Sequence, residues 1–198
     1  MNSALRRIEK VNKEIGGTAT LSTETFLRTY GFKLTVIGDS LTSSAKGSMS
    51  LYFPNSFVNS KGSRELRDAL TVLNEMKENN EIGDGIVLAL GTNSSKAIDV
   101  EALEAVYNEI QKFDKPTPMI ILSIVLPYKM QEQERNAALQ SFADTHKYCF
   151  IADWHDNAKT HKECFMDDNI HPTGIGNDLY AQVIYNAYVE GIDYINNH

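Results

Sequence analysis

The chain has 198 residues, of which 42% are hydrophobic, and a formal net charge of −7. A single domain of this size buries roughly 70% of the surface that its unfolded chain exposes, so its core requires neither a metal nor a set of disulfides. The acidic balance and the lack of a Lys/Arg-rich run exclude nucleic acid as the expected partner, and no stretch approaches the ~20 apolar residues of a membrane span.

Residues 1–32 are expected to form an N-terminal helical extension or a linker. Leu5, Ile8 and Ile15 are spaced to form one face of a short helix that ends before Gly16 and Gly17. The segment lacks the continuous apolar region of a signal peptide. We therefore place the folded domain at residues 33–198.

Five short apolar segments of this domain are predicted to be strands. The last three are almost continuously apolar rather than alternating, which is typical of strands buried on both faces. The second, SFVN, has the weakest strand pattern. The predicted strands cover residues 33–37, 56–59, 86–90, 119–124 and 148–152.

Segments with helical periodicity lie between these strands. Asp99 is placed to cap the second of these helices, and Thr173 or Asn177 to cap the last. The residues that recur at steps of three and four are Leu66, Leu70, Leu73 and Met76, then Leu103, Val106, Ile110 and Phe113, then Leu139 and Phe142, and finally Leu179, Val183, Ile184 and Ala187.

Strands that alternate with helices form βαβ units, whose crossovers require a parallel sheet with helices on both faces. The sequence therefore predicts a three-layer α/β/α sandwich with a five-stranded parallel sheet, of flavodoxin-like type, and leaves the strand order open. Ligands of such sheets bind beyond the carboxyl ends of the strands. Functional residues are therefore expected directly after strands.

Two cysteines, Cys149 and Cys164, are too few for a disulfide framework. We expect both to be small buried side chains. The sequence has no CxxC and no Cys/His ligand spacing, so we expect no structural metal and no bound cofactor.

Ser40 follows the first strand in the sequence Gly38-Asp39-Ser40. A serine at a strand-to-helix turn presents its hydroxyl at the edge of the sheet, and the preceding glycine permits a tight backbone. Gly, Asp and Ser are also ordinary turn residues. The motif alone is therefore compatible with a plain turn that caps the next helix, with Asp39 holding the turn by hydrogen bonds.

Asp168 and His171 lie three residues apart, just before the last helix. A serine hydroxyl needs a base to take its proton, and histidine is suited to this near neutral pH. A carboxylate on the other ring nitrogen keeps such a histidine in one tautomer. Asp168 has the right spacing for that role; Asp167 competes for it with a less suitable spacing.

Asn93 follows the third strand in Gly91-Thr92-Asn93. A side-chain amide at a strand end is able to donate a hydrogen bond to an oxyanion, and loss of one such donor costs ~3 kcal/mol of transition-state stabilisation. Asparagine is common in turns, so this motif too is informative only in combination.

In combination these motifs resemble those of the SGNH hydrolase superfamily, from about Lys33 to the C-terminus. The resemblance implies the SGNH hydrolase fold and a Ser–His–Asp triad. It also implies an oxyanion hole formed by backbone N–H groups and an asparagine amide. The triad would comprise Ser40, His171 and Asp168, and the oxyanion hole Ser40, Asn93 and either Gly62 or Ser63, which follow the second strand.

A closer resemblance, over roughly the last two-thirds of the chain, is to the extracytoplasmic C-terminal domain of peptidoglycan O-acetyltransferases. It rests on IVLALGTNS at 86–94, SIVLPYKMQEQERN at 123–136 and FIADWHDNAKTHKECFMDDNIHPTG at 150–174. It implies transfer of acetyl through Ser40 to a hydroxyl of muramic acid residues in peptidoglycan, with the acetyl delivered by a membrane acyltransferase domain. It implies a location at the extracellular face of the cell membrane, as a soluble domain of a larger protein; a free-standing chain would be cytoplasmic.

Two other functions compete with this one. An SGNH esterase, such as a carbohydrate acetyl esterase, a small lipase or a thioesterase, uses the same triad with water as the acceptor. A glycan-binding module with a decayed site is the third possibility, and it has no need of an intact Ser40, Asp168 and His171.

Several further polar and aromatic residues are of types that bind glycans or metals. The segment after Pro127 is expected to be a long loop, with glycan contact by Lys129, Gln131 and Arg135 as a minor alternative. Trp154 is expected to pack rather than to line a sugar groove. His155 and His161 are expected on loop surfaces.

Overall fold

A computed structural model describes residues 6, 9–10, 13–14, 31–94 and 97–198. The described residues among the first fourteen are helical and exposed, and Lys10 and Glu14 approach to 4.0 Å across one helical turn. Leu5, Ile8 and Ile15, which carry the expected apolar face, lie outside the described residues. The boundary at residue 32 therefore stays a prediction.

The sheet has five parallel strands in the order β2-β1-β3-β4-β5, which is the flavodoxin-like order. This confirms the expected five-stranded parallel sheet, and each strand begins within one residue of its predicted start. β1, β3 and β4 are buried along their whole length. The strands are β1 (Leu34–Gly38), β2 (Phe57–Ser60), β3 (Gly85–Ala89), β4 (Met119–Leu122) and β5 (Cys149–Ala152).

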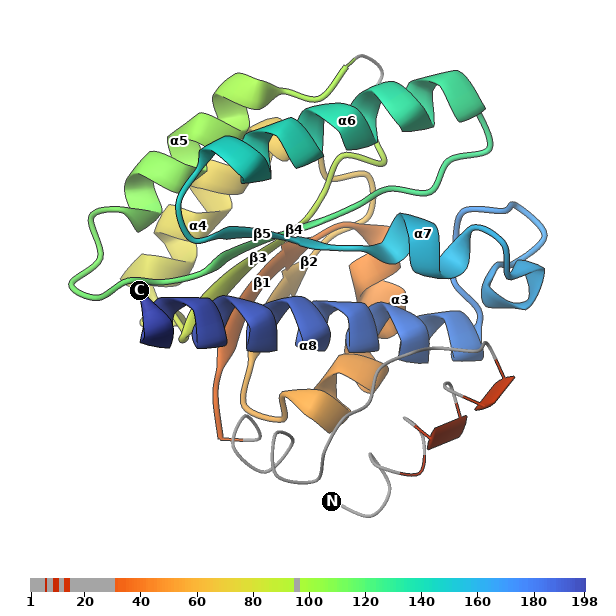
Figure 1. Ribbon diagram of the computed structural model, residues 1–198, viewed down its shortest axis with the longest axis horizontal. Coiled ribbons are helices and arrows are strands. Elements are labelled where there is room, and N and C mark those ends of the chain that lie inside the picture. The colour runs from red at the N-terminus through yellow and green to blue at the C-terminus, as the bar shows by residue number, and fades with distance from the viewer. Residues whose placement is uncertain (1–5, 7–8, 11–12, 15–30, 95–96) are drawn as a thin grey trace.

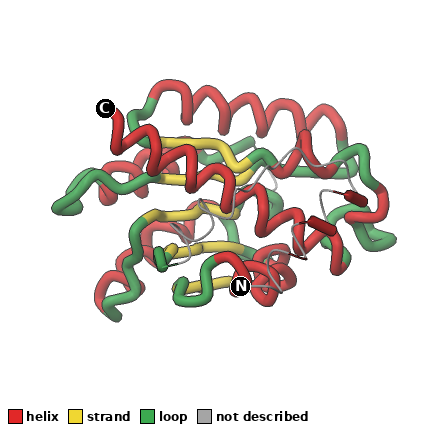
Figure 2. Tube along the Cα trace, turned by 60° about the horizontal axis from the view of Figure 1, so that its bottom comes forward, coloured by secondary structure: helices red, strands yellow, loops and turns green. Residues whose placement is uncertain are grey.

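Helices cover both faces of this sheet, as Figures 1 and 2 show. Val36 and Ile37 are neighbours in β1 but belong to two different buried clusters, because successive side chains of a strand point to opposite faces. On the Val36 face lie α3 (Ser40–Tyr52) and α8 (Gly174–Asn197), with the short α7 (Trp154–Ala158). On the Ile37 face lie α4 (Ala69–Glu78), α5 (Val100–Ile110) and α6 (Lys129–Thr145).

The last helix, α8, supplies much of the core on its face of the sheet. Tyr180, Ile184 and Tyr188 are completely buried, and Tyr185 is almost so. Tyr194, near the end of the helix, is 40% exposed. The tyrosines of this helix thus have mainly packing roles.

Side-chain caps set the starts of three helices at the carboxyl edge of the sheet. Asp39 accepts a hydrogen bond from Leu41 N at the start of α3, and Asp99 accepts one from Ala102 N at the start of α5. Thr173, rather than Asn177, caps α8 by accepting from Gly176 N. Such caps satisfy backbone N–H groups that the first helical turn leaves unpaired.

One sequence expectation about secondary structure is wrong. The segment from Lys129 is not a long loop: it is the first half of α6, and Lys129, Gln131 and Arg135 are helical residues. The apolar pattern missed this half because its inward-facing residues are polar. Glu132 and Arg135 are 8% and 4% exposed, respectively.

Cys149 and Cys164 are free, buried thiols, as expected. Burial raises the pKa of each to about 12, so neither is a nucleophile near neutral pH. Among the described helices, none combines the length and the apolar character needed to cross a bilayer.

Candidate active site

The strand order brings three candidate loops to one place. β1 lies between β2 and β3, and Gly38 at its end pairs with Ser60 on one side and Ala89 on the other. The segments that follow these strands carry Ser40, the Gly62-Ser63 turn and Asn93. All of these therefore lie at the carboxyl edge of the sheet.

Ser40 is the first residue of α3, and its hydroxyl lies beside the imidazole of His171. The distance between Ser40 Oγ and His171 Nε2 is 3.0 Å. Gly38 is needed at the turn because a Cβ there would overlap the side chain of Thr42, whose hydroxyl is 2.9 Å from that of Tyr180. The backbone before Ser40 is thus pressed against the helix that begins with it.

Asp168 holds the other ring nitrogen of His171. Its Oδ2 lies 2.7 Å from His171 Nδ1, and its Oδ1 accepts backbone hydrogen bonds from Ile170 and His171. The hydrogen bond from the His171 ring, followed by those from the backbone, lowers the pKa of Asp168 to about 2. With the proton on Nδ1, Nε2 is an acceptor that faces the Ser40 hydroxyl.

The loop that carries Asp168 and His171 is held to the fold by its own backbone. Met166 N donates to His171 O over 2.8 Å, and Thr173 N donates to Cys164 O over 2.9 Å, beside an antiparallel bridge between Phe165 and Pro172. Asp168, and not Asp167, contacts His171. The choice that the sequence left between these two carboxylates is thus made by the geometry of this turn.

Asn93 points its amide at two acceptors inside the site. Its Nδ2 lies 2.9 Å from Asp39 Oδ2 and 3.3 Å from the carbonyl oxygen of Arg64. Asp39 is almost completely buried, and burial raises its pKa to about 6. Asp39 therefore links the cap of α3 to the loop after β3, in agreement with the expectation that it holds the turn.

The turn after β2 contains both candidates for the backbone oxyanion donor. Ser63 has φ 57°, a left-handed conformation that favours glycine. Within the described part of the chain, the backbone N–H groups of Gly62 and Ser63 donate no hydrogen bond. Either group is therefore available to an acceptor at this edge of the sheet.

Arg64, which follows that turn, was not singled out in the sequence. Its guanidinium is mostly buried and donates to Gly38 O over 3.0 Å, to Asn59 O over 2.6 Å and to Asn59 Oδ1 over 2.7 Å. It thereby ties the ends of β1 and β2 together. A buried arginine of this kind has no local sequence signature, because two of its three acceptors are backbone carbonyl oxygens, which every residue has.

Among the described residues, the ring contacts of Trp154 and the side-chain hydrogen bonds of His155 and His161 go to groups other than Ser40. Trp154 is completely buried against Phe165 and Tyr180, so its expected packing role is confirmed. His155 is not on a loop surface, contrary to expectation: it lies in α7 with its Nε2 2.7 Å from Glu132 Oε1. His161 lies in the loop that follows α7, as expected, with its Nδ1 3.2 Å from Glu163 Oε1.

One group of described residues has the donor types of a metal site. The ligand atoms of Asp153, His155 and Asp156 lie within 4.8 Å of one another. Each side chain already has protein partners, since Ser123 donates to Asp153, and both Lys159 and His155 contact Asp156. We therefore assign no metal to this group.

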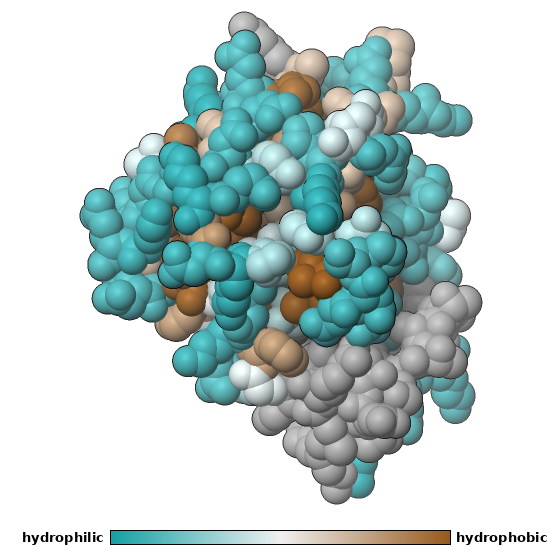
Figure 3. All heavy atoms as spheres, turned by 60° about the vertical axis from the view of Figure 1, so that its left-hand side comes forward, coloured by the Kyte–Doolittle hydropathy of each residue, from teal (hydrophilic) through white to brown (hydrophobic). Residues whose placement is uncertain are grey.

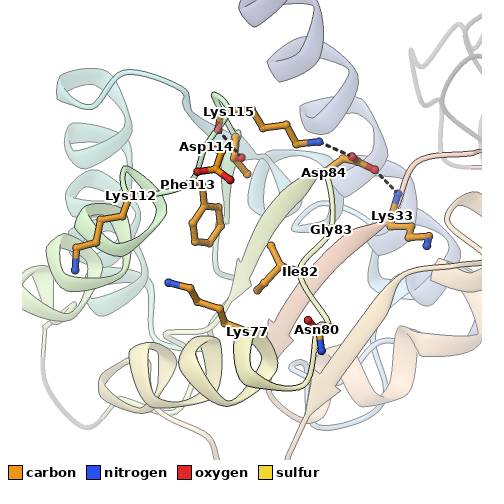
Figure 4. A pocket seen from close by; sticks show the side chains of 11 residues that line it. Lys33, Lys77, Asn80, Ile82, Gly83, Asp84, Lys112, Phe113, Asp114 and Lys115 are labelled. Atoms are coloured by element: carbon orange, nitrogen blue, oxygen red, sulfur yellow. Dashed lines mark hydrogen bonds and ion pairs between the residues drawn. The ribbon is translucent and has the colours of Figure 1, made fainter.

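A pocket of about 650 Å³ lies at the opposite edge of the sheet, where the strands begin (Figure 4). Lys77 and Lys112 of this pocket share the carboxylate of Glu109, and Lys115 pairs with Asp84. That side of the molecule is mostly hydrophilic, with small separate hydrophobic patches (Figure 3). The length of the strands, about 15 Å, separates it from the serine and histidine, so we do not assign it to the active site.

Comparisons with known proteins show similarities of sequence and of fold. No protein-family model matches the chain. The chain is 27% identical over 152 residues to the candidate peptidoglycan O-acetyltransferase YrhL of Bacillus subtilis, and 24% identical over 148 residues to the peptidoglycan O-acetyltransferase OatA of Listeria monocytogenes. These alignments cover 76% and 75% of the chain but only 23% and 22% of the relatives, so the chain matches less than a quarter of their length.

Solved structures share the fold. The C-terminal catalytic domain of Streptococcus pneumoniae OatA, solved with a methylsulfonyl adduct, superposes with a TM-score of 0.69 at 22% identity over 81% of this chain and 94% of that one. A Slackia heliotrinireducens protein described as an SGNH hydrolase candidate has a TM-score of 0.64 at 17% identity, over 78% and 97%. A family 3 carbohydrate esterase of Clostridium thermocellum has a TM-score of 0.65 at 13% identity, over 84% and 98%. The chain thus has the SGNH hydrolase fold, as expected.

Proposed function

We propose that this chain is a serine-dependent O-acetyltransferase that moves an acetyl group through Ser40 to a hydroxyl of muramic acid residues in peptidoglycan. The observation that carries the proposal is the unbroken hydrogen-bonded series Ser40–His171–Asp168, with distances of 3.0 and 2.7 Å. The similarity to YrhL and OatA supports peptidoglycan as the acceptor.

In the first half-reaction, Ser40 Oγ attacks the carbonyl carbon of an acetyl donor while His171 Nε2 takes the hydroxyl proton. The imidazolium that forms is stabilised by the Asp168 carboxylate, which stays ionised. The tetrahedral intermediate then collapses, the C–O bond to the leaving group breaks, and His171 returns the proton to that group. The product is acetyl-Ser40.

In the second half-reaction, a sugar hydroxyl takes the place of the leaving group. His171 removes its proton, the sugar oxygen attacks the acetyl carbon, and the bond to Ser40 Oγ breaks. Ser40 Oγ then regains a proton from His171. The enzyme is restored, and the sugar carries the acetyl ester.

Three donors are proposed to stabilise the oxyanion: the backbone N–H groups of Ser40 and Ser63, and the amide of Asn93. Ser63 is preferred to Gly62 because its left-handed φ is the conformation for which the superfamily's glycine is suited. The Asn93 amide has two hydrogens, so donation to the oxyanion requires it to give up one present contact. The 3.3 Å contact with the Arg64 carbonyl is the longer and weaker of the two.

The donor and the location follow from the same proposal. We propose that a membrane acyltransferase domain delivers the acetyl group and that the chain works at the extracellular face of the cell membrane. The support is that the relatives are more than four times as long as the region they share with this chain.

The second candidate is an esterase with the same triad, in which water attacks acetyl-Ser40. The side chains of His171 and Asp168 are 38% and 47% exposed, so solvent reaches the base. The fold shared with a carbohydrate esterase fits this alternative as well. A binding module with a decayed site is disfavoured, because all three triad side chains are present and bonded.

The test follows the fate of the acetyl group of 4-nitrophenyl acetate with and without muro-oligosaccharides. We expect acetylated sugar to form, and acetyl-Ser40 to be detected by mass on the intact chain. Fast hydrolysis with no acetylated sugar would favour the esterase. Ser40→Ala is expected to abolish the adduct; an adduct that persists on another residue would overturn the nucleophile assignment.

A further inference from the structure

The first half of α6 presents polar side chains to the loops at the carboxyl edge of the sheet. Asn136 accepts from Ile124 N and donates to Ile124 O, both over 2.8 Å. Glu132 accepts from Leu126 N over 2.7 Å. These two side chains hold the loop that follows β4.

Arg135 holds the loop that follows β3 in the same way. Its guanidinium donates to Gly91 O over 2.9 Å, to Thr92 O over 3.3 Å and to Ser94 O over 2.5 Å. These carbonyl groups lie on both sides of Asn93 in the chain. The backbone on which Asn93 stands is therefore held by one side chain from another element.

The loop that Arg135 holds turns at a glycine whose conformation other residues rarely adopt. Gly91 has φ 118°, which side-chain-bearing residues rarely adopt, and a Cβ there would press on Ile124 and Ile98. An arginine is suited to the task, since its planar group offers five donors in a rigid fork. Arg135 is only 4% exposed, and among the described residues its hydrogen-bond partners are all backbone carbonyl oxygens rather than carboxylates.

We propose that Arg135 is a positioning residue for oxyanion stabilisation: by fixing the carbonyls around Asn93, it sets the place of the Asn93 amide. This rests on the proposed function, in which that amide is an oxyanion donor. Arg135 itself does not touch the reacting atoms. It acts on the rate only through Asn93.

The test is a double-mutant cycle on the rate of acetyl-Ser40 formation from 4-nitrophenyl acetate. The variants are Arg135→Met, Asn93→Ala and the pair together, with Arg67→Met as the matched control, because the Arg67 side chain is 69% exposed. We expect Asn93→Ala to lower kcat by about 10²- to 10³-fold. Arg135→Met is expected to lower kcat by about 10²-fold with little change in KM, as a misplacement of about 1 Å does.

The decisive result is the double variant. If Arg135 acts through Asn93, Arg135→Met has no further effect in the Asn93→Ala background, and the double variant matches Asn93→Ala within about twofold, which is a large departure from additivity. The inference would be overturned if the loss of kcat in the double variant equalled the product of the two single losses, or if Arg135→Met alone lost no kcat. Arg67→Met is expected to keep the rate of the unmodified chain.

Arg135→Lys guards against loss of folding in Arg135→Met. It keeps the charge but offers a single nitrogen, so we expect an intermediate loss of kcat that again vanishes in the Asn93→Ala background. A chain that never acetylates Ser40 would refute the proposed function. A chain that does so, slows in Asn93→Ala and gives an additive cycle would refute only the role of Arg135.

Discussion

The side-chain amide of Asn93 donates a hydrogen bond to the buried carboxylate of Asp39, with 2.9 Å between Nδ2 and Oδ2. The other oxygen of that carboxylate accepts from Leu41 N and caps the helix that begins at Ser40. One carboxylate therefore joins the proposed nucleophile's helix to the proposed oxyanion donor. A substitution of Asp39 is therefore expected to affect both the start of α3 and the position of the Asn93 amide.

Asp39→Asn is expected to change how stability depends on pH. Burial raises the pKa of Asp39 from 3.8 to about 6. Between these values the folded chain binds more protons than the unfolded chain, so Asp39 contributes less stability as pH rises, by on the order of 2–3 kcal/mol in total. Asparagine keeps the cap and does not titrate. Urea unfolding should therefore show that the free energy of unfolding of the variant rises, relative to that of the unmodified chain, from pH 4 to pH 7.

Asp99→Asn is the control for that measurement. Asp99 caps α5 in a similar way, but it is exposed. Its variant should follow the unmodified chain over the same pH range. Stability curves that stay parallel for Asp39→Asn would contradict the expected linkage.

Asp168→Asn is expected to lower kcat/KM for an acetyl ester by roughly 10⁴-fold, because an amide neither holds the Nδ1–H tautomer of His171 nor stabilises the imidazolium. Asp167→Asn is the matched control, one residue away and not in contact with the imidazole. It should change kcat/KM by less than about twofold. Equal losses in the two variants would mean that the turn, and not the carboxylate on Nδ1, matters.

Ser63→Gly is expected to stabilise the chain by up to about 1 kcal/mol, because glycine adopts φ 57° without strain. The backbone N–H is retained, so acetyl-Ser40 should form at an unchanged rate. Urea unfolding and the burst of 4-nitrophenol measure the two effects. A large loss of rate would show that the Ser63 hydroxyl, rather than its backbone, takes part.

Gly176→Ala is expected to destabilise the chain by roughly 1–3 kcal/mol, since its Cβ would overlap the carbonyl oxygen of Cys164. Gly174→Ala, two residues earlier in α8, has open space around the new methyl group and should be neutral or stabilising by up to about 1 kcal/mol. The midpoints of urea unfolding distinguish the two. Equal midpoints would contradict the close approach of α8 to Cys164.

The sequence predicted the strands well because three of them are apolar on both faces, a pattern that survives without knowledge of their neighbours. It failed at the first half of α6, where the inward face is formed by Glu132, Arg135 and Asn136. These side chains hydrogen-bond to loop backbone, so they are buried without being apolar. Hydrophobic periodicity detects only the burial of apolar side chains.

The order of strands and polar residues along the chain was enough to predict that Ser40 and Asn93 lie at one edge of a parallel sheet. The resemblance to a known family implied that Asp168 and His171 join them there. The three-dimensional structure was needed to place β1 between β2 and β3, to show that Asp168 rather than Asp167 contacts His171, and to show that the Asn93 amide donates to Asp39. The physical reason is that burial of apolar side chains gives a recognisable pattern of apolar residues along the chain. A hydrogen bond between residues some fifty positions apart, such as Asp39 and Asn93, gives no such pattern.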